Sequence, residues 1–427
     1  MKIIIDGTTY TEIKNLKFDP QTDITGIEAV INGFSADIMT DDDIDVGGNA
    51  YLYDDMDNLW AKYWLVEAVR KDKFTVNVEA KSILLILDRK TMDVTMYSNT
   101  PVSSIISSIF SGLTSEYTLD PSFAGKTISG YCPKQSARER LQWVCFCIGA
   151  YLKTFFADKI LIIPVNTNPK VVPMDKTYWK PSITYGNVVT AVQATVYTYR
   201  QGTPENTDTW VDVNGTYYIQ TSQEFNITNP DAPITANENV VSVSNVTIIN
   251  NSNISEILTL LSTYYFKRIE VDADIINNAD YEAGDKIVLP VDDETLVSGF
   301  IKSENFTFGL QAKSKIKLMQ TDVVESGTLH IIRRYGNLEI GNAIYLFPIG
   351  YSYTIQNIYV DLISGGNRRT VYFPLQPNAT GTMSSEEVTD IEYYGIALIF
   401  YGGILDVLSV DEVESKTEDG IIIVEVS

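Results

Sequence analysis

The sequence contains one stretch twice. Residues 36–59 read ADIMTDDDIDVGGNAYLYDDMDNL, and residues 273–296 read ADIINNADYEAGDKIVLPVDDETL. Aligned without a gap, 8 of the 24 pairs are identical, among them Gly47 and Gly284. Each copy reads as a strand, an acidic turn containing glycine, and a second strand. The repeat therefore favours a chain that builds one β module twice.

Two interpretations of the repeat stay open. An acidic turn with glycine between apolar residues is common hairpin chemistry, and a shorter echo, NLEIGNAIYLF, occurs at 337–347. The gapless length of the longer match, and the further strands expected after both copies, favour duplicated domains. Three copies of such a chain would present six similar modules in a ring. That ring could join a three-fold object to a six-fold object.

The secondary-structure signals predict a mainly β chain. Many segments are rich in Val, Ile, Tyr, Phe and Thr, often in alternation, as in FTVNVEA, VVTAVQATVYTY and SKIKLM. The polar, Asn- and Thr-rich region 200–250 predicts long surface loops between strands. YLKTFFADKILIIPV predicts two strands around Ala157-Asp158.

Helical patterns are concentrated in three places. In NTPVSSIISSIFSGL, Thr100 is the expected cap and Pro101 the first helical residue. In SARERLQWVCFCIGAYL, Ser136 and Glu139 are spaced as a capping box before an apolar face. A third helix is expected in ISEILTLLSTYYFKR. All three helices fall between the repeated stretches, and the first two, close together, indicate an inserted α+β domain.

Charge and apolar runs exclude several classes of protein. The net charge is −23 and the pI is about 4.4. Such a surface repels phosphates, so specific nucleic acid binding is not expected. The short apolar run at the start does not resemble a signal peptide, and no run has the length of a membrane span. Three cysteines give no even disulfide framework. These features predict a soluble protein made in the cytoplasm.

The candidate catalytic groups are weak. Adjacent acids at Asp41-Asp42-Asp43, Asp54-Asp55 and 292–294 could be compared with paired glycosidase carboxylates. Acids in glycine-containing turns of an acidic protein are more often simply solvated. The single histidine, His330, has no second histidine for a metal pair and no G-x-S-x-G motif, so a structural strand residue is expected. No enzyme is predicted.

The cysteines and tryptophans favour packing and contact roles. Cys145 and Cys147 lie two residues apart on a predicted helix, so their side chains point to nearly opposite sides. Cys132, before Pro133, is expected in a loop. Neither metal nor cofactor is predicted.

Trp60 and Trp64, in a chain with 26 tyrosines, fit protein–protein interfaces or carbohydrate stacking equally well.

Two long segments resemble a known family. LDRKTMDVTMYSNTPVSSIISSIF (87–110) and TISGYCPKQSARERLQWVCFCIGAYLKTFFADKILIIP (127–164) are similar to baseplate hub proteins of contractile phage tails. Related particles include phage-tail-like bacteriocins (tailocins) and other contractile injection systems. The run GDKIVLP, GFIKSENFTFG and SKIKLM (284–319) resembles the second barrel of such hubs. The resemblance covers about the first 325 residues.

The resemblance implies a fold and a domain plan. The expected fold is mainly β with an inserted α+β domain, two tail-tube-like β-barrel domains and a C-terminal all-β domain. The expected domains are a first tube-like barrel (1–92), a helical α+β domain (93–172), a second tube-like barrel (173–325) and a C-terminal β-rich domain (326–427).

The resemblance also implies a function. A hub of this family is a structural homotrimer that adapts the three-fold central spike to the six-fold tail tube. Its expected partners are the tail tube or a tube-initiator protein, the spike, other baseplate proteins and the tape measure. It assembles in the bacterial cytoplasm and then resides in the virion or particle baseplate.

Within that interpretation, Asp41, Asp42 and Asp43 are hypothesised to face the axial channel and repel passing DNA. The alternative is a tail fibre or adhesin that binds carbohydrate or a host surface. Imaging separates the two, because a hub lies on the particle axis and an adhesin lies at its periphery.

Overall fold

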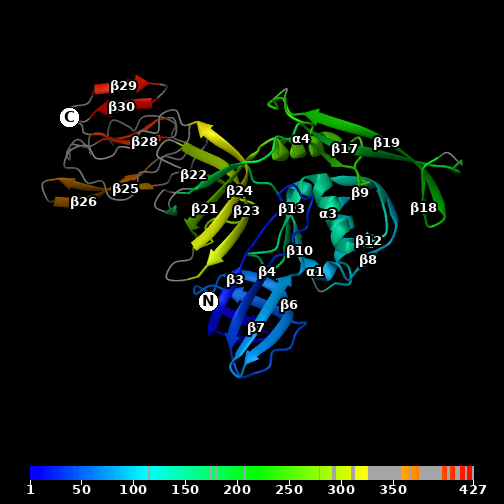
Figure 1. Ribbon diagram of the computed structural model, residues 1–427, viewed down its shortest axis with the longest axis horizontal. Helices are drawn as coiled ribbons and strands as arrows, with labels where there is room; N and C mark the ends of the chain where they lie inside the picture. Colours follow the sequence, from blue (N-terminus) through cyan, green and yellow to red (C-terminus); the bar gives the residue numbers. More distant parts are fainter. Residues whose placement is uncertain are drawn as a thin grey trace. The chain divides into compact units, whose positions relative to one another are not determined.

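A computed structural model describes most of the first 325 residues and six strands beyond them. The described ranges are 1–113, 116–172, 176–177, 181–205, 208–233, 235–277, 279–290, 295–308 and 313–325, with strands between 357 and 425. Strands far outnumber helices in these ranges, so the predicted mainly β class is confirmed (Figure 1). No helix among the described residues is both long enough and apolar enough to cross a membrane.

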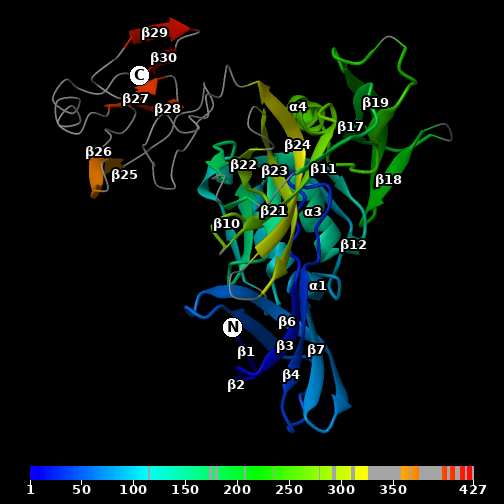
Figure 2. The same ribbon diagram turned by 60° about the vertical axis from the view of Figure 1, so that its left-hand side comes forward.

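The first repeated stretch lies in a seven-stranded module. Its strands are β1 (Lys2–Ile5), β2 (Thr8–Tyr10), β3 (Ile13–Phe18), β4 (Gly33–Met39), β5 (Asn49–Tyr53), β6 (Leu59–Asp72) and β7 (Thr75–Ser82). They pair in the order β3-β4-β7-β6-β5-β1-β2. Buried and partly exposed residues alternate strictly along β7, as expected for a sheet with one face on a core. Figure 2 shows β6 and β7 side by side at the lower end of the view.

The second stretch lies in strands that pair in the same order. These are β16 (Ser182–Tyr185), β21 (Ile269–Ile276), β22 (Lys286–Pro290), β23 (Thr295–Thr307) and β24 (Lys313–Glu325). The order β16-β21-β24-β23, with β22 also pairing with β23, repeats β3-β4-β7-β6 with β5. The structure therefore supports duplication over the alternative of unrelated hairpins. The echo at 337–347 lies outside the described residues.

A helix-bearing region follows the first module, as predicted. It contains α1 (Leu84–Leu87), β8 (Thr91–Met92), β9 (Thr95–Pro101), α2 (Val102–Phe110), β10 (Tyr117–Leu119), η1 (Pro121–Phe123), β11 (Thr127–Cys132), β12 (Gln135–Ser136), α3 (Ala137–Ile148), β13 (Ala150–Lys153) and β14 (Ile160–Pro164). The capping box of Ser136 and Glu139 is present at α3. The two strands expected around Ala157-Asp158 are β13 and β14, which pair antiparallel.

The start of α2 differs from the prediction by one residue. Thr100 and Pro101 belong to β9, and Pro101 is the N-cap rather than the first helical residue. Pairing of Thr127 with Pro101 holds this segment extended. The register of β9 with β11, which is a long-range contact, therefore decides where the helix begins.

The predicted surface loops account for only part of region 200–250, which also contains strands. The structure has β17 (Ala191–Gln201), β18 (Trp210–Val213), β19 (Thr216–Thr228) and β20 (Val240–Val243) there, in the order β18-β19-β17-β20. β17 and β19 pair along eleven consecutive residues of β17. Polar Thr, Gln and Asn side chains are compatible with a strand that has one solvent-exposed face. The third expected helix is α4 (Ile254–Tyr265), and the buried Ile257 and Leu261 are part of the core cluster that also contains β17.

The chain divides into two compact units. One comprises Met1–Asn168, Ile183–Lys286 and Gly299–Thr321, and the other comprises Pro169–Ser182, Ile287–Ser298 and Asp322–Ser427. The second unit includes β15 (Lys170–Val171), which pairs with β22. It also includes three hairpins: β25 (Asn357–Ser364) with β26 (Asn367–Pro374), β27 (Ala397–Tyr401) with β28 (Ile404–Leu408), and β29 (Glu414–Glu418) with β30 (Ile421–Glu425). The domain boundaries at 92, 172 and 325 stay predictions.

Candidate functional site

The most specific feature of both modules is a glycine turn that enters the second strand of each repeat. Gly47 and Gly284 have φ angles of +97° and +98°, which favour glycine. The Gly47 N–H donates to the Leu65 oxygen at 3.0 Å, and the Leu65 N–H donates to the Gly48 oxygen at 2.9 Å. A backbone conformation that requires glycine therefore explains why this residue occupies the same position in both stretches.

The second module repeats the same pair of backbone bonds. The Gly284 N–H donates to the Ile301 oxygen at 2.7 Å, and the Ile301 N–H donates to the Asp285 oxygen at 2.9 Å. The turns differ in their surroundings. A Cβ on Gly47 would meet only the Trp64 ring, at 3.9 Å, whereas a Cβ on Gly284 would lie 2.8 Å from the Tyr151 hydroxyl.

The loop after β4 is held by one arginine of β6. The Arg70 guanidinium donates to the main-chain oxygens of Thr40, at 3.3 Å, of Asp41, at 3.1 Å, and of Asp42. It also donates to the Asp43 carboxylate at 2.9 Å. Main-chain oxygens accept well from the fixed fork of a guanidinium. Arg70 is therefore the residue that shapes the acidic loop.

The corresponding loop of the second module is held by a carboxyl group instead. Glu304, on β23, is 1% exposed. It accepts from the Asn277 side-chain amide at 2.8 Å and from the Ala283 N–H at 2.9 Å. Burial raises the pKa of Glu304 well above its ordinary value. The hydrogen bond from Ala283 lowers this pKa in part, and the charge of the nearby Glu282 raises it further. Glu304 fixes the second loop by accepting hydrogen bonds from it, whereas Arg70 fixes the first loop by donating hydrogen bonds to it.

The two loops also differ in exposure. The second loop carries the buried Tyr281 and Ala283, and Glu282 forms an ion pair with Lys153 of β13. The first loop is open, and the Asp43 side chain is 95% exposed. Both loops expose charge, at Asp41–Asp43 in the first and at Asp280 in the second, but Glu282 of the second loop is largely covered in its ion pair.

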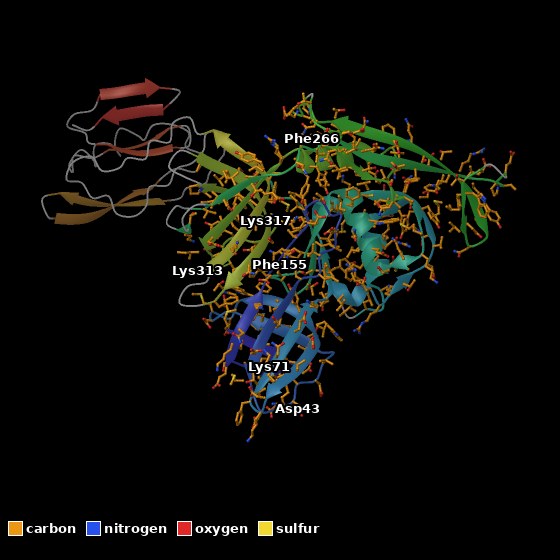
Figure 3. The ribbon with its side chains drawn as sticks, viewed as in Figure 1. Asp43, Lys71, Phe155, Phe266, Lys313 and Lys317 are labelled. Atoms are coloured by element: carbon orange, nitrogen blue, oxygen red, sulfur yellow. The ribbon has the colours of Figure 1, made fainter. Side chains whose placement is uncertain are left out.

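The structure places the predicted acidic residues as follows. Asp41, Asp42 and Asp43 are all exposed, and Figure 3 labels Asp43 in the same module as Lys71. Asp54 accepts from the N–H groups of Met56 and Asn58, both at 2.8 Å, so it shapes a turn. The acids at 292–294 and His330 lie outside the described residues.

The cysteines are free and buried. Cys145 and Cys147 pack inside the core cluster on α3, as predicted. Cys132 is not in a loop, because it ends β11 and pairs with Thr95 of β9. Burial raises its pKa to about 12, although the nearby Arg140 lowers it in part. The described residues contain no group of three His, Cys, Asp or Glu side chains that could hold a metal.

The aromatic residues divide between core and surface. Trp60 is 3% exposed, and its ring lies 5.8 Å from Phe18 and 4.9 Å from Phe306, so it is a core residue. Trp64 is partly exposed and lies 5.7 Å from the Arg89 guanidinium. The structure therefore gives Trp60 no part in a contact surface.

Sequence reasoning missed Arg70 and Glu304. The signal that could have found them is a charged residue inside the strand that runs back past the acidic turn. That signal does not say which loop a side chain reaches, because the contacts span 27 residues for Arg70 with Asp43 and 27 for Glu304 with Asn277.

Two solved structures share this architecture. The 43 kDa tail protein of prophage MuSo2 from Shewanella oneidensis has a TM-score of 0.51 and 8% identity, covering 74% of this chain and 96% of its own. The tail protein from Neisseria meningitidis MC58 has a TM-score of 0.52 and 10% identity, covering 74% and 95%. The chain has the fold of these tail proteins. The resemblance found in the sequence is thereby confirmed at the level of the fold.

A third structure, prophage tail protein gp18 from Listeria monocytogenes EGD-e, is 11% identical over 75% of this chain and 94% of its own, with a TM-score of 0.49. No protein-family model matches the sequence. No curated protein matches it either.

Replacing Arg70 with alanine is expected to loosen the acidic loop without unfolding the module. Loss of the three main-chain hydrogen bonds to the loop should cost about 1–2 kcal/mol locally, so proteolytic cleavage between residues 40 and 48 should become roughly tenfold faster. Lysine at this position should rescue little, because an ammonium cannot reproduce the fork. The measurement is limited proteolysis with mapping of the cut sites.

The matched control is Lys71→Ala, one residue further along β6. Lys71 forms its ion pair with Asp37 of β4, at 2.7 Å, and not with the loop. If both variants are cleaved at the same rate in the loop, the role assigned to Arg70 is wrong.

Proposed function

We propose that this chain is a structural baseplate hub of a contractile phage tail or phage-tail-like bacteriocin. In this role it forms a homotrimer that adapts a three-fold central spike to a six-fold tail tube. The observation that carries the proposal is the duplicated module, in which β4-β7-β6-β5 and β21-β24-β23-β22 have the same order. Two similar modules per chain allow three chains to present six similar surfaces.

The fold supports the same proposal. The Shewanella and Neisseria structures are tail proteins, and each is matched along nearly its whole length. The proposed partners are the tail tube or its initiator, the spike, neighbouring baseplate proteins and the tape measure. The proposed role is assembly rather than catalysis, with residence in the particle after synthesis in the bacterial cytoplasm.

The acidic loop of the first module has a place in this proposal. Asp41, Asp42 and Asp43 would line the axial channel, where negative charge repels a passing polyanion. Support comes from the exposure of all three side chains and from the net charge of −23. Arg70 would hold the loop in shape while leaving the carboxylates in solvent.

We expect the purified full chain to be a trimer by light scattering coupled to size exclusion. Electron cryo-microscopy of the particle should place it on the axis beneath a hexameric tube ring, with residues 41–43 facing the channel. A chain at the particle periphery would overturn the proposal in favour of the carbohydrate- or host-binding alternative. Six copies of this chain on the axis would contradict the proposal that three chains, with two modules each, present six similar surfaces. A map in which residues 41–43 face outward would contradict only the channel role.

A further inference from the structure

Among the described residues, the two repeated modules are joined through β23 and β3. Near its C-terminal end, β23 meets β3 in antiparallel pairing, with Phe306 opposite Phe18. Their rings stack at 5.9 Å, and both side chains are buried. The Thr22 N–H extends the junction by donating to the Lys302 oxygen at 3.0 Å. The second module is thus joined to the first by the far half of one strand.

The repeat provides the same two edges a second time, and neither edge has a further strand partner among the described residues. β6 corresponds to β23, since each is the long third strand of its repeat. On the side away from β7, pairing of β6 with β5 ends at Asn49 and Trp64, and the glycine turn adds only Leu65. Among the described strands, none pairs with this side of β6 beyond that point. Val69, which lies in this half and pairs with Asn77 of β7 on its other side, is 45% exposed.

The other edge is β16, which corresponds to β3 because β16 flanks β21 as β3 flanks β4. Within the described part of the chain, β16 ends the strand path and pairs only with β21. Tyr185, its last residue, is 61% exposed, whereas Phe18, the last residue of β3, is buried. The Gly186 N–H donates to the Arg268 oxygen on the β21 side, so the Tyr185 N–H points to the open side.

We propose that the β16 edge of one chain pairs with the far half of β6 in a second copy of this chain. This contact would repeat, between chains, the junction that β23 and β3 form within one chain. It rests on the proposed trimer and names its interface. The sequence of β16, SITY, has neither charge nor proline, and these are the usual devices that protect an exposed edge from pairing.

The contact is directional, since it joins two different edges. A directional contact repeated by rotation closes into a ring in which first and second modules alternate. It would also cover Val69 and Tyr185, two of the large hydrophobic side chains left exposed. The rival edge is β2, which ends the same path on the other side but has only three residues.

The test is disulfide cross-linking in the full chain. Val69→Cys is combined with Thr184→Cys in one variant and with Tyr185→Cys in another, because successive strand residues point to opposite faces. One variant should give covalent dimers and trimers, and nothing larger, on a non-reducing gel. The native Cys132, Cys145 and Cys147 are buried and provide the unreactive background.

Charge substitution gives an independent measurement. Val69→Glu and Tyr185→Glu should each weaken assembly at least about tenfold, measured as the concentration at which the trimer dissociates. Thr9→Glu, at the exposed β2 edge, is the matched control and should leave the trimer intact. Circular dichroism confirms that each variant is folded.

The failures are distinguishable. A wild-type chain that is not a trimer overturns the proposed function, and this interface with it. A trimer that neither cross-links through these pairs nor responds to the glutamates overturns the interface alone. Dissociation by Thr9→Glu with no effect of Tyr185→Glu would assign the contact to β2 and overturn the inference.

Discussion

Gly284→Ala is expected to destabilise the protein by about 3 kcal/mol or more, whereas Gly47→Ala should cost about 1–2 kcal/mol. Both glycines have a positive φ near 100°, so alanine introduces the same backbone strain at each. Only at Gly284 would the new methyl group also meet Tyr151, at 2.8–3.0 Å from three ring and hydroxyl atoms. The measurement is urea unfolding of both variants and the native chain.

The internal repeat makes this comparison unusually direct. The two variants carry one chemical change at equivalent positions, so their difference isolates the steric effect of Tyr151. The double variant Gly284→Ala with Tyr151→Phe should recover only part of the loss, because the ring remains. Equal destabilisation by the two alanines would show that the clash is relieved and that strain alone matters.

Glu304→Gln is expected to flatten the dependence of stability on pH. Since burial raises the pKa of Glu304 in the folded state, the folded protein holds a proton that the unfolded chain releases above its carboxyl pKa of about 4.5. Glu304 therefore stabilises the fold fully below that value. Its contribution is lost as pH rises, by up to about 1.4 kcal/mol per pH unit, until the folded pKa is reached.

The difference between native protein and variant is the quantity to measure. Urea unfolding at a series of pH values from about 4.5 to 7 gives the free energy of unfolding of each. The native protein should lose stability relative to Glu304→Gln as pH rises. Glu282→Gln is a control, since it removes the neighbouring charge that raises the pKa of Glu304 and keeps the buried carboxyl. Parallel curves for native protein and Glu304→Gln would show that Glu304 does not hold the proton.

The correct predictions were those that depend on local pattern. The capping box at Ser136 sets the start of α3, and the alternation in FTVNVEA sets β7. Both signals act within a few residues, so neighbouring side chains suffice to specify them. The wrong predictions fell where distant segments decide. Cys132 lies on a strand because Thr95 pairs with it, and the polar β19 is a strand because β17 pairs along it.

The sequence by itself determined where the two matching turns lie, because a turn with a positive φ favours glycine and leaves Gly47 and Gly284 at matching positions. Only the tertiary structure decided how each loop is held and which edges remain free. Arg70 and Glu304 reach their loops across strands that are distant in sequence, and the open sides of β6 and β16 depend on how whole sheets pair. Those outcomes are set by long-range packing, which no local pattern encodes.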